Sequence, residues 1–266
     1  MNDAPLGVFD SGIGGLTVAR ALFERLPHEA VLYFGDTARV PYGPKSPETV
    51  RRYSAEILAY LLGRGVKAVV VACNTSTAHA LDHLRSRASV PVVGVIEPGA
   101  RAAVAASRSG TIGVIGTMGT VASGAYERAI KALRPDATVV SAACPLFVPL
   151  VEEGWFDHPA AELIAREYLE PLRRSGVDVV VLGCTHYPLL KPLLQRVLGA
   201  GVQLIDSAEA TAAQVVKELA ARDLAASARP RPEHVFAVSD DEPRFRRVGE
   251  RFLGERLKQV SVVPLG

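Results

Sequence analysis

Short runs of β-branched and other apolar residues recur along the chain, and each is followed within a few positions by glycine, proline or a small polar residue. Continuous apolar runs of this length are typical of strands that are buried on both faces, as in parallel sheets covered by helices. The pattern predicts strands at residues 6–9, 30–34, 69–71, 92–96, 112–116, 179–182, 204–206, 235–238 and 260–263.

Longer amphipathic segments separate many of these runs. They predict helices over residues 16–26, 47–64, 74–87, 208–221 and 242–253. Strands that alternate with helices indicate an α/β fold built on parallel sheets.

Four landmarks of the first half recur in the second half in the same order, at offsets from 106 (Gly7 to Gly113) to 111 (Cys73 to Cys184). Val148-Pro149 matches Val40-Pro41, and residues 204–206 match residues 95–97. Two domain-sized copies indicate an internal duplication rather than a solenoid. We therefore expect two similar parallel-sheet domains related by a pseudo-two-fold axis, with a cleft between them.

The elements after residue 208 have no counterpart in the second copy, so we expect them to return to the first sheet. The predicted domains are residues 1–97 plus 208–266, and residues 98–207. We expect the chain to cross between them at Glu97-Pro98-Gly99, and we expect a surface loop over residues 225–233.

Cys73 and Cys184 each follow a buried strand and precede a predicted helix. The amides and dipole at a helix N-terminus favour an anion, so we expect this position to lower a thiol pKa. A lone cysteine is usually a small buried apolar residue, but a matched pair favours catalysis. Two opposed thiols can remove a proton from one face of a carbon and return one on the other face, which is racemisation. Cys144 lacks a matching cysteine and is expected to be structural.

Four ionisable residues are expected near the two cysteines. Asp10 ends the first strand, Asp36 lies in the next loop, Glu152 lies in the equivalent loop of the second copy, and His186 lies two residues after Cys184. Each is a candidate to polarise a thiol or a substrate ammonium group. Local rules alone favour a helix cap for Asp10 and a side-chain bond that holds its loop for Asp36, and the position opposite the thiols favours a role in the site more for Asp10 than for Asp36.

Other polar features are expected to be less specific. The glycine turn at residues 12–15 lacks the full spacing of a dinucleotide fingerprint, and it suits backbone amides that face a small anion. We expect His79, His83 and the arginine-rich segment 244–251 to form solvated faces.

The composition limits which classes of partner, cofactor site and location are expected. The chain has 266 residues, 48% of them hydrophobic, and a formal net charge of +2, which implies neither a nucleic acid nor a membrane as partner. The three cysteines have no metal-ligand spacing, so we expect neither a metal site nor disulfides. No signal pattern or long apolar run is present, and we expect a cytoplasmic protein.

Motifs along essentially the whole chain resemble those of the glutamate racemases, cofactor-independent bacterial enzymes that supply D-glutamate for peptidoglycan. The motifs are DSGIGGL at residues 10–16, DTARVPYG at 36–43, ACNT at 72–75 and GCTHYP at 183–188. The resemblance implies that Cys73 acts on D-glutamate and Cys184 on L-glutamate. It further implies that Asp10 and His186 assist these thiols, with Asp36 and Glu152 behind them.

The resemblance also implies substrate contacts from Asp10, Ser11, Pro41, Tyr42, Gly43, Asn74, Thr75, Thr117, Thr185 and His186. It implies no cofactor and allows a homodimer. Because the first strand begins close to residue 1, we expect no N-terminal extension of the kind found in members that need a cell-wall precursor as activator.

Three alternatives stay open at this point. An aspartate racemase needs only a modest change of pocket. A non-catalytic protein that binds a small anion could use the duplicated glycine turns. An interaction with DNA gyrase, reported for some members of the family, is neither supported nor excluded by the small net charge.

Overall fold

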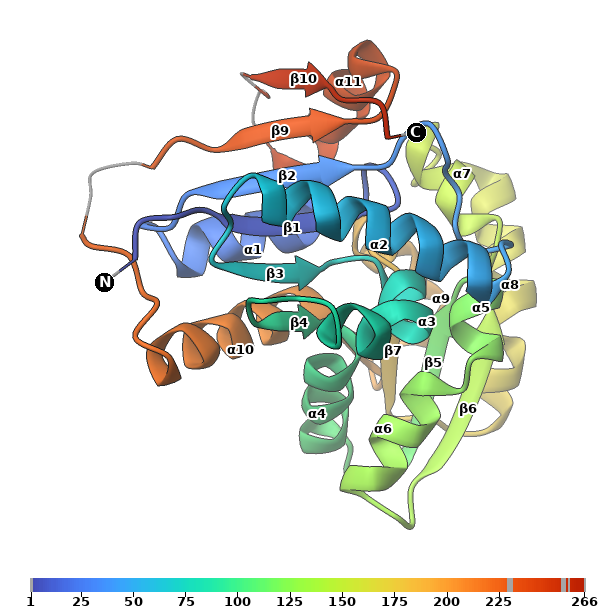
Figure 1. Cartoon of the computed structure of the whole chain (residues 1–266). Coiled ribbons are helices and arrows are strands. Elements are labelled where there is room, and N and C mark those ends of the chain that lie inside the picture. The colour runs from blue at the N-terminus through green and yellow to red at the C-terminus, as the bar shows by residue number, and fades with distance from the viewer. Residues whose placement is uncertain (1, 229–231, 255–256, 258, 266) are drawn as a thin grey trace.

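A computed structural model describes residues 2–228, 232–254, 257 and 259–265. Residues 229–231, within the loop predicted over residues 225–233, lie outside the described residues. The α/β class predicted from the sequence is confirmed, because the described strands form two parallel sheets flanked by helices (Figure 1).

The first sheet has six parallel strands in the order β10-β9-β2-β1-β3-β4 and crosses the upper part of Figure 1. Its strands are β1 (Leu6–Asp10), β2 (Val31–Gly35), β3 (Ala68–Val71), β4 (Val92–Gly94), β9 (Val235–Val238) and β10 (Val260–Val262). Strand β9 pairs with β2, so the C-terminal strands return to the first sheet as the sequence predicts.

The second sheet has four parallel strands in the order β6-β5-β7-β8. They are β5 (Thr111–Gly116), β6 (Thr138–Ala143), β7 (Val179–Gly183) and β8 (Gln203–Asp206). This order repeats the order β2-β1-β3-β4 of the first sheet, which supports the duplication inferred from the sequence. One landmark differs in local structure, because Val148-Pro149 lies in a helix whereas Val40-Pro41 lies in a loop.

Helices cover both faces of each sheet. Helices α2 (Pro47–Gly63) and α3 (Asn74–Arg85) pack together over one face of the first sheet, and the opposite face carries α1 (Leu16–Arg25), α10 (Ser207–Ala221) and α11 (Glu242–Leu253). The second sheet lies between α4 (Ile96–Ala106) with α6 (Ala125–Leu133) and α8 (Pro159–Arg174) with α9 (Lys191–Leu198). Short helices α5 (Met118–Ala122) and α7 (Phe147–Glu152) and the 3-10 turn Tyr187–Leu190 complete the chain.

The predicted connection at residues 97–99 is wrong in its local structure. Strand β4 ends at Gly94, and Glu97, Pro98 and Gly99 form the start of α4. Proline is tolerated in the first turn of a helix because the amide hydrogen that it lacks has no partner there. The domain limits 1–97 plus 208–266 and 98–207 stay predictions.

None of the described helices is long and apolar enough to cross a membrane.

Candidate active site

The two predicted thiols occupy equivalent places in the two sheets. Cys73 follows β3 and caps the N-terminus of α3, and Cys184 follows β7, the strand in the same position of the second sheet. Ligands of α/β proteins bind at the carboxyl ends of parallel strands. Cys73 is only 5% exposed and Cys184 only 7% exposed, so both sulfur atoms are shielded from water.

Cys73 lies among polar groups of the first sheet. Its Sγ lies 3.6 Å from the Ser11 hydroxyl and accepts a hydrogen bond from the Ser76 amide at 3.4 Å. Burial, followed by the nearby Asp10 carboxylate, nevertheless raises the pKa of Cys73 to about 11. The expectation of a lowered pKa is therefore wrong for Cys73, because burial outweighs the amides of the helix N-terminus.

Asp10 joins the two halves of the molecule. One carboxylate oxygen accepts from the Gly12 amide at 2.9 Å, and the other accepts from the Thr185 hydroxyl at 3.4 Å. Burial raises the pKa of Asp10, although nearby His186 opposes this. Asp10, Ser11, Cys73, Thr185 and His186 are thus brought together as the sequence predicts.

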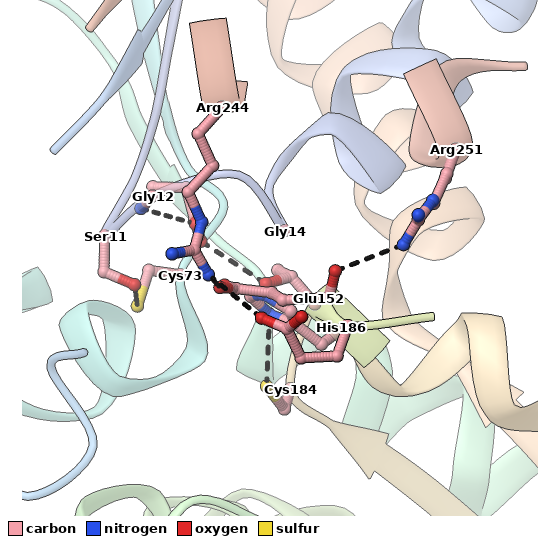
Figure 2. A network of polar contacts seen from close by, with 12 residues as sticks. Ser11, Gly12, Gly14, Cys73, Glu152, Cys184, His186, Arg244 and Arg251 are labelled. Carbon is pink, nitrogen blue, oxygen red and sulfur yellow. Dashed lines mark hydrogen bonds and ion pairs between the residues drawn. The ribbon is translucent and has the colours of Figure 1, made fainter. Parts of the chain in front are cut away.

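Cys184 has an acid–base chain of its own (Figure 2). Its Sγ lies 3.9 Å from Nδ1 of His186, and Nε2 of His186 lies 3.0 Å from Oε1 of Glu152. Burial alone lowers the pKa of His186, but the contacts with Cys184 and Glu152 outweigh burial and raise it to about 10. Burial acts to raise the pKa of Glu152, yet His186 and Arg244 lower it, so an imidazolium–carboxylate pair stands behind Cys184.

The arginine-rich segment is not simply a solvated face. Arg244 Nη2 on α11 contacts Oε2 of Glu152 at 2.9 Å, and Arg251 Nη1 donates to the main-chain oxygen of Glu152 at 3.1 Å. Sequence reasoning missed both residues. Their spacing of seven residues, which places them on one helical face, is the signal that could have indicated a shared target.

A cluster of hydroxyl groups joins α3 of the first half to α5 of the second half. Thr75 Oγ1 lies 2.9 Å from Thr117 Oγ1 and 3.2 Å from Thr120 Oγ1. Beside it, the Gly119 amide donates to the Gly43 carbonyl at 2.9 Å, so the loop after β2 meets the start of α5. Of the residues predicted to bind substrate, this brings together Thr75, Thr117 and Gly43.

His79 supports the same junction, contrary to the expectation of a solvated face. The residue is half-buried, and its Nε2 lies 3.0 Å from the Gly119 carbonyl oxygen.

Asn74 offers an unused donor. Its Oδ1 accepts from the Tyr126 hydroxyl at 2.7 Å, whereas its buried Nδ2 finds no partner among the described residues. A buried amide hydrogen without a partner costs free energy, so it suits a position that a ligand oxygen fills. Tyr126, another residue that the sequence did not single out, therefore orients Asn74.

Asp36 lies in a separate cluster. Its carboxylate accepts hydrogen bonds from Arg39, the Tyr42 hydroxyl and Ser239, the last at 2.8 Å. Both Asp36 and Tyr42 are buried, and their polar groups are used to hold the loop that carries Pro41 and Gly43. This arrangement matches the loop-holding alternative for Asp36, and its catalytic role stays a prediction.

The glycine turn after β1 meets neighbouring side chains. A Cβ atom at Gly14 would lie 2.3 Å from Thr185 Oγ1 and 2.5 Å from His186 Nδ1, and one at Gly15 would lie 2.4 Å from the Asp10 Cβ. The close approach of the second half therefore explains Gly14, where the sequence suggested amides that face an anion.

Cys144 is fully buried, with Sγ 3.6 Å from the Ala142 carbonyl oxygen, in keeping with a structural role. Among the described residues, no group of His, Cys, Asp and Glu side chains could hold a metal ion.

Two repeated parallel sheets with a buried thiol at each equivalent strand end define the class of α/β racemases. The family of Asp/Glu/Hydantoin racemases matches residues 15–215. The chain belongs to this family, and it is an isomerase.

Named relatives and solved structures agree with this assignment. The chain is 55% identical over 260 residues to a protein of Geobacter metallireducens named glutamate racemase, which covers 98% of this chain and 96% of the relative. The structure of glutamate racemase isoform RacE1 from Bacillus anthracis superposes with a TM-score of 0.96 at 40% identity, covering 100% of this chain and 99% of the other. That of glutamate racemase from Francisella tularensis, in complex with D-glutamate, has a TM-score of 0.93 at 37% identity, with the same coverages. The racemase assignment disfavours a non-catalytic anion-binding protein.

Proposed function

We propose that this protein is a glutamate racemase that interconverts L- and D-glutamate by proton transfer at Cα between two thiols. The names of its relatives support the substrate. The observation that carries the mechanism is the pair of buried cysteines at equivalent strand ends, each with a different polar partner.

The proposed reaction needs one thiolate and one thiol at a time. With L-glutamate bound, the Cys184 thiolate takes the α-proton, and the Cys73 thiol delivers its proton to the opposite face of the carbanion. The product is D-glutamate, and the enzyme is left with a Cys184 thiol and a Cys73 thiolate. The raised pKa of Cys73 favours the protonation state of the enzyme that reacts with L-glutamate, because in that state Cys73 already holds the proton to be delivered.

The neighbouring groups support each proton transfer. The His186 imidazolium lies against the Cys184 sulfur and offsets negative charge that forms there. Ser11 and the Ser76 amide contact the Cys73 sulfur. The Asn74 amide and the hydroxyls of Thr75 and Thr117 are donors for the substrate carboxylates, of which the α-carboxylate gains negative charge as the carbanion forms.

The other predicted contacts complete the proposed pocket. Asp10 and Thr185 join the halves beside the thiols, and Pro41, Tyr42 and Gly43 lie in the loop that meets α5. In this proposal the protein supplies D-glutamate for peptidoglycan in the cytoplasm and uses no cofactor.

A chiral assay tests the proposal. Purified protein, dialysed and without added pyridoxal phosphate, should convert either enantiomer of glutamate to the racemic mixture and should act on aspartate more slowly. Faster conversion of aspartate than of glutamate would identify aspartate as the substrate instead. A requirement for pyridoxal phosphate would exclude the two-thiol mechanism.

A further inference from the structure

Glu152, the partner of His186, is itself held from another part of the chain. Arg244 contacts its carboxylate, and Arg251 donates to its main-chain oxygen. Figure 2 shows both arginines reaching toward Glu152 from α11, on the side away from Cys184. A third residue of this helix, Phe252, places its ring edge-on to His186, with the ring centroids 5.4 Å apart.

This support comes from a segment without a repeat. Helix α11 lies between β9 and β10, the two strands that extend the first sheet beyond the order shared with the second sheet. The contacts of Cys73 described above come from Ser11 and Ser76, which follow repeated strands. The C-terminal segment therefore acts on the acid–base chain of one thiol.

Exposed ion pairs usually contribute little to stability, and the Arg244 side chain is 43% exposed. This ion pair differs from most exposed pairs because the second oxygen of its carboxylate makes a buried contact. The Glu152 side chain is 12% exposed, and its second oxygen contacts His186, which is buried. A contact that fixes one oxygen of a carboxylate also fixes the direction of the other.

We propose that Arg244 is a positioning residue for the Cys184 half of the reaction. Its guanidinium holds the Glu152 carboxylate so that Oε1 faces Nε2 of His186, and His186 in turn is kept charged beside Cys184. The inference rests on the proposed function, because it assumes that Cys184 transfers the proton of L-glutamate.

Arg244→Met tests the inference, because methionine keeps an unbranched apolar stem and removes the charge and the donors. Arg244→Lys keeps the positive charge but loses the planar guanidinium, so it should retain part of the influence of Arg244 on His186. Arg247→Met is the matched control, since Arg247 is an exposed arginine of the same helix.

The first measurement is an NMR titration of protein with 13C-labelled histidine, with His186 assigned from a His186→Asn variant. In the native protein His186 should stay protonated until about pH 10. In Arg244→Met the Glu152 carboxylate is free to turn toward solvent, and the pKa of His186 should fall by about one unit or more. An unchanged or raised pKa would overturn the inference, as would an equal fall in Arg247→Met.

The second measurement separates the two thiols. Because L- and D-glutamate have equal free energies, any variant must show the same kcat/KM in both directions, so racemisation alone cannot reveal which thiol is affected. Elimination from a glutamate analogue with chloride on the β-carbon needs only one base. The thiolate takes the α-proton, a Cα–Cβ double bond forms, and chloride leaves with its electron pair.

Arg244→Met should slow elimination from the L analogue by about 10- to 100-fold and should change elimination from the D analogue by less than about threefold. Equal slowing of both enantiomers would overturn the inference. If the native protein fails to racemise glutamate, the proposed function falls, and the histidine titration still decides whether Arg244 sets the charge of His186.

Discussion

The raised pKa of Cys73 has a direct chemical consequence, because only the thiolate reacts readily with alkylating reagents. We predict that iodoacetamide modifies Cys73 slowly at neutral pH and increasingly fast up to about pH 11, as peptide mass spectrometry measures. Saturating glutamate should protect Cys73 and Cys184. Cys144, which is fully buried, is the internal control and should react more slowly than either. Equal rates at the three cysteines would contradict the proposed site.

Each thiol should serve one enantiomer. Cys73→Ser and Cys184→Ser should each reduce racemisation by about 100-fold or more, because an alcohol is a far weaker acid than a thiol. With the β-chloro analogue, Cys184→Ser should retain elimination from the D form and Cys73→Ser from the L form. Retention of the same enantiomer by both variants would refute the division of labour.

The raised pKa of His186 also makes stability depend on pH. A group with a higher pKa in the folded state binds its proton more tightly there, so its stabilising effect is complete below the unfolded pKa. The free energy of unfolding should therefore decline between about pH 6.5 and about pH 10. In Glu152→Gln this decline should be smaller, as urea unfolding at several pH values measures. A steeper decline in that variant would exclude the ion pair as its cause.

At the scale of single residues, the sequence predicted best where a motif and a repeat coincided. The thiol pair, Asp10, Thr185 and His186 lie together as expected. Arg244 and Tyr126 were missed because their roles depend on partners far away in the chain, Glu152 and Asn74. The spacing of Arg244 and Arg251 indicates a shared helical face, but it does not identify the residue that this face contacts.

Among the elements, the glycine turn between β1 and α1 is the tightest junction with the second half. Gly14→Ala should reduce kcat/KM by about 100-fold, because the added Cβ would meet Thr185 and His186 and push the acid–base chain away from Cys184. Gly63→Ala is the control, since an added Cβ there has no neighbour within 4 Å, and it should keep activity and slightly raise the melting temperature. Similar kinetics for the two variants would contradict the crowding argument.

Apolar runs located every described strand except β6, and amphipathic periods located α1, α2, α3, α10 and α11, within a few residues at each end. No range was predicted for β6 or for helices α4 to α9. Helix α11 matches its predicted range, and β9 does as well. The error at residues 97–99 has a simple origin, since proline and glycine mark a loop in most contexts but are also accepted at the start of a helix.

For the molecule as a whole, the duplication could be predicted from the order of four landmarks, whereas the contacts between the two halves could not. They join side chains from both halves, among them Thr75 with Thr117 and Asp10 with Thr185. Since both thiols are shielded, we expect these contacts to open when substrate enters.

Bound glutamate should hinder this opening. We predict that saturating glutamate slows hydrogen exchange of the Gly119 amide, which donates to Gly43 in the other half, by about tenfold or more. NMR exchange measurements would show this, with the amide of Val180 in β7 as a control that should change little. Equal slowing of both amides would indicate general stabilisation instead of closure.

The position of α11 in the sequence also sets the order in which the site is completed during synthesis. Both thiols, Glu152 and His186 are translated well before Arg244, and domains tend to fold as they emerge from the ribosome at about 5–20 residues per second. For a few seconds a nascent chain can carry both sulfur atoms while its Glu152 carboxylate still lacks the guanidinium from α11. Under the proposed role of Arg244, the acid–base chain of Cys184 is therefore complete only when the last part of the chain has been made.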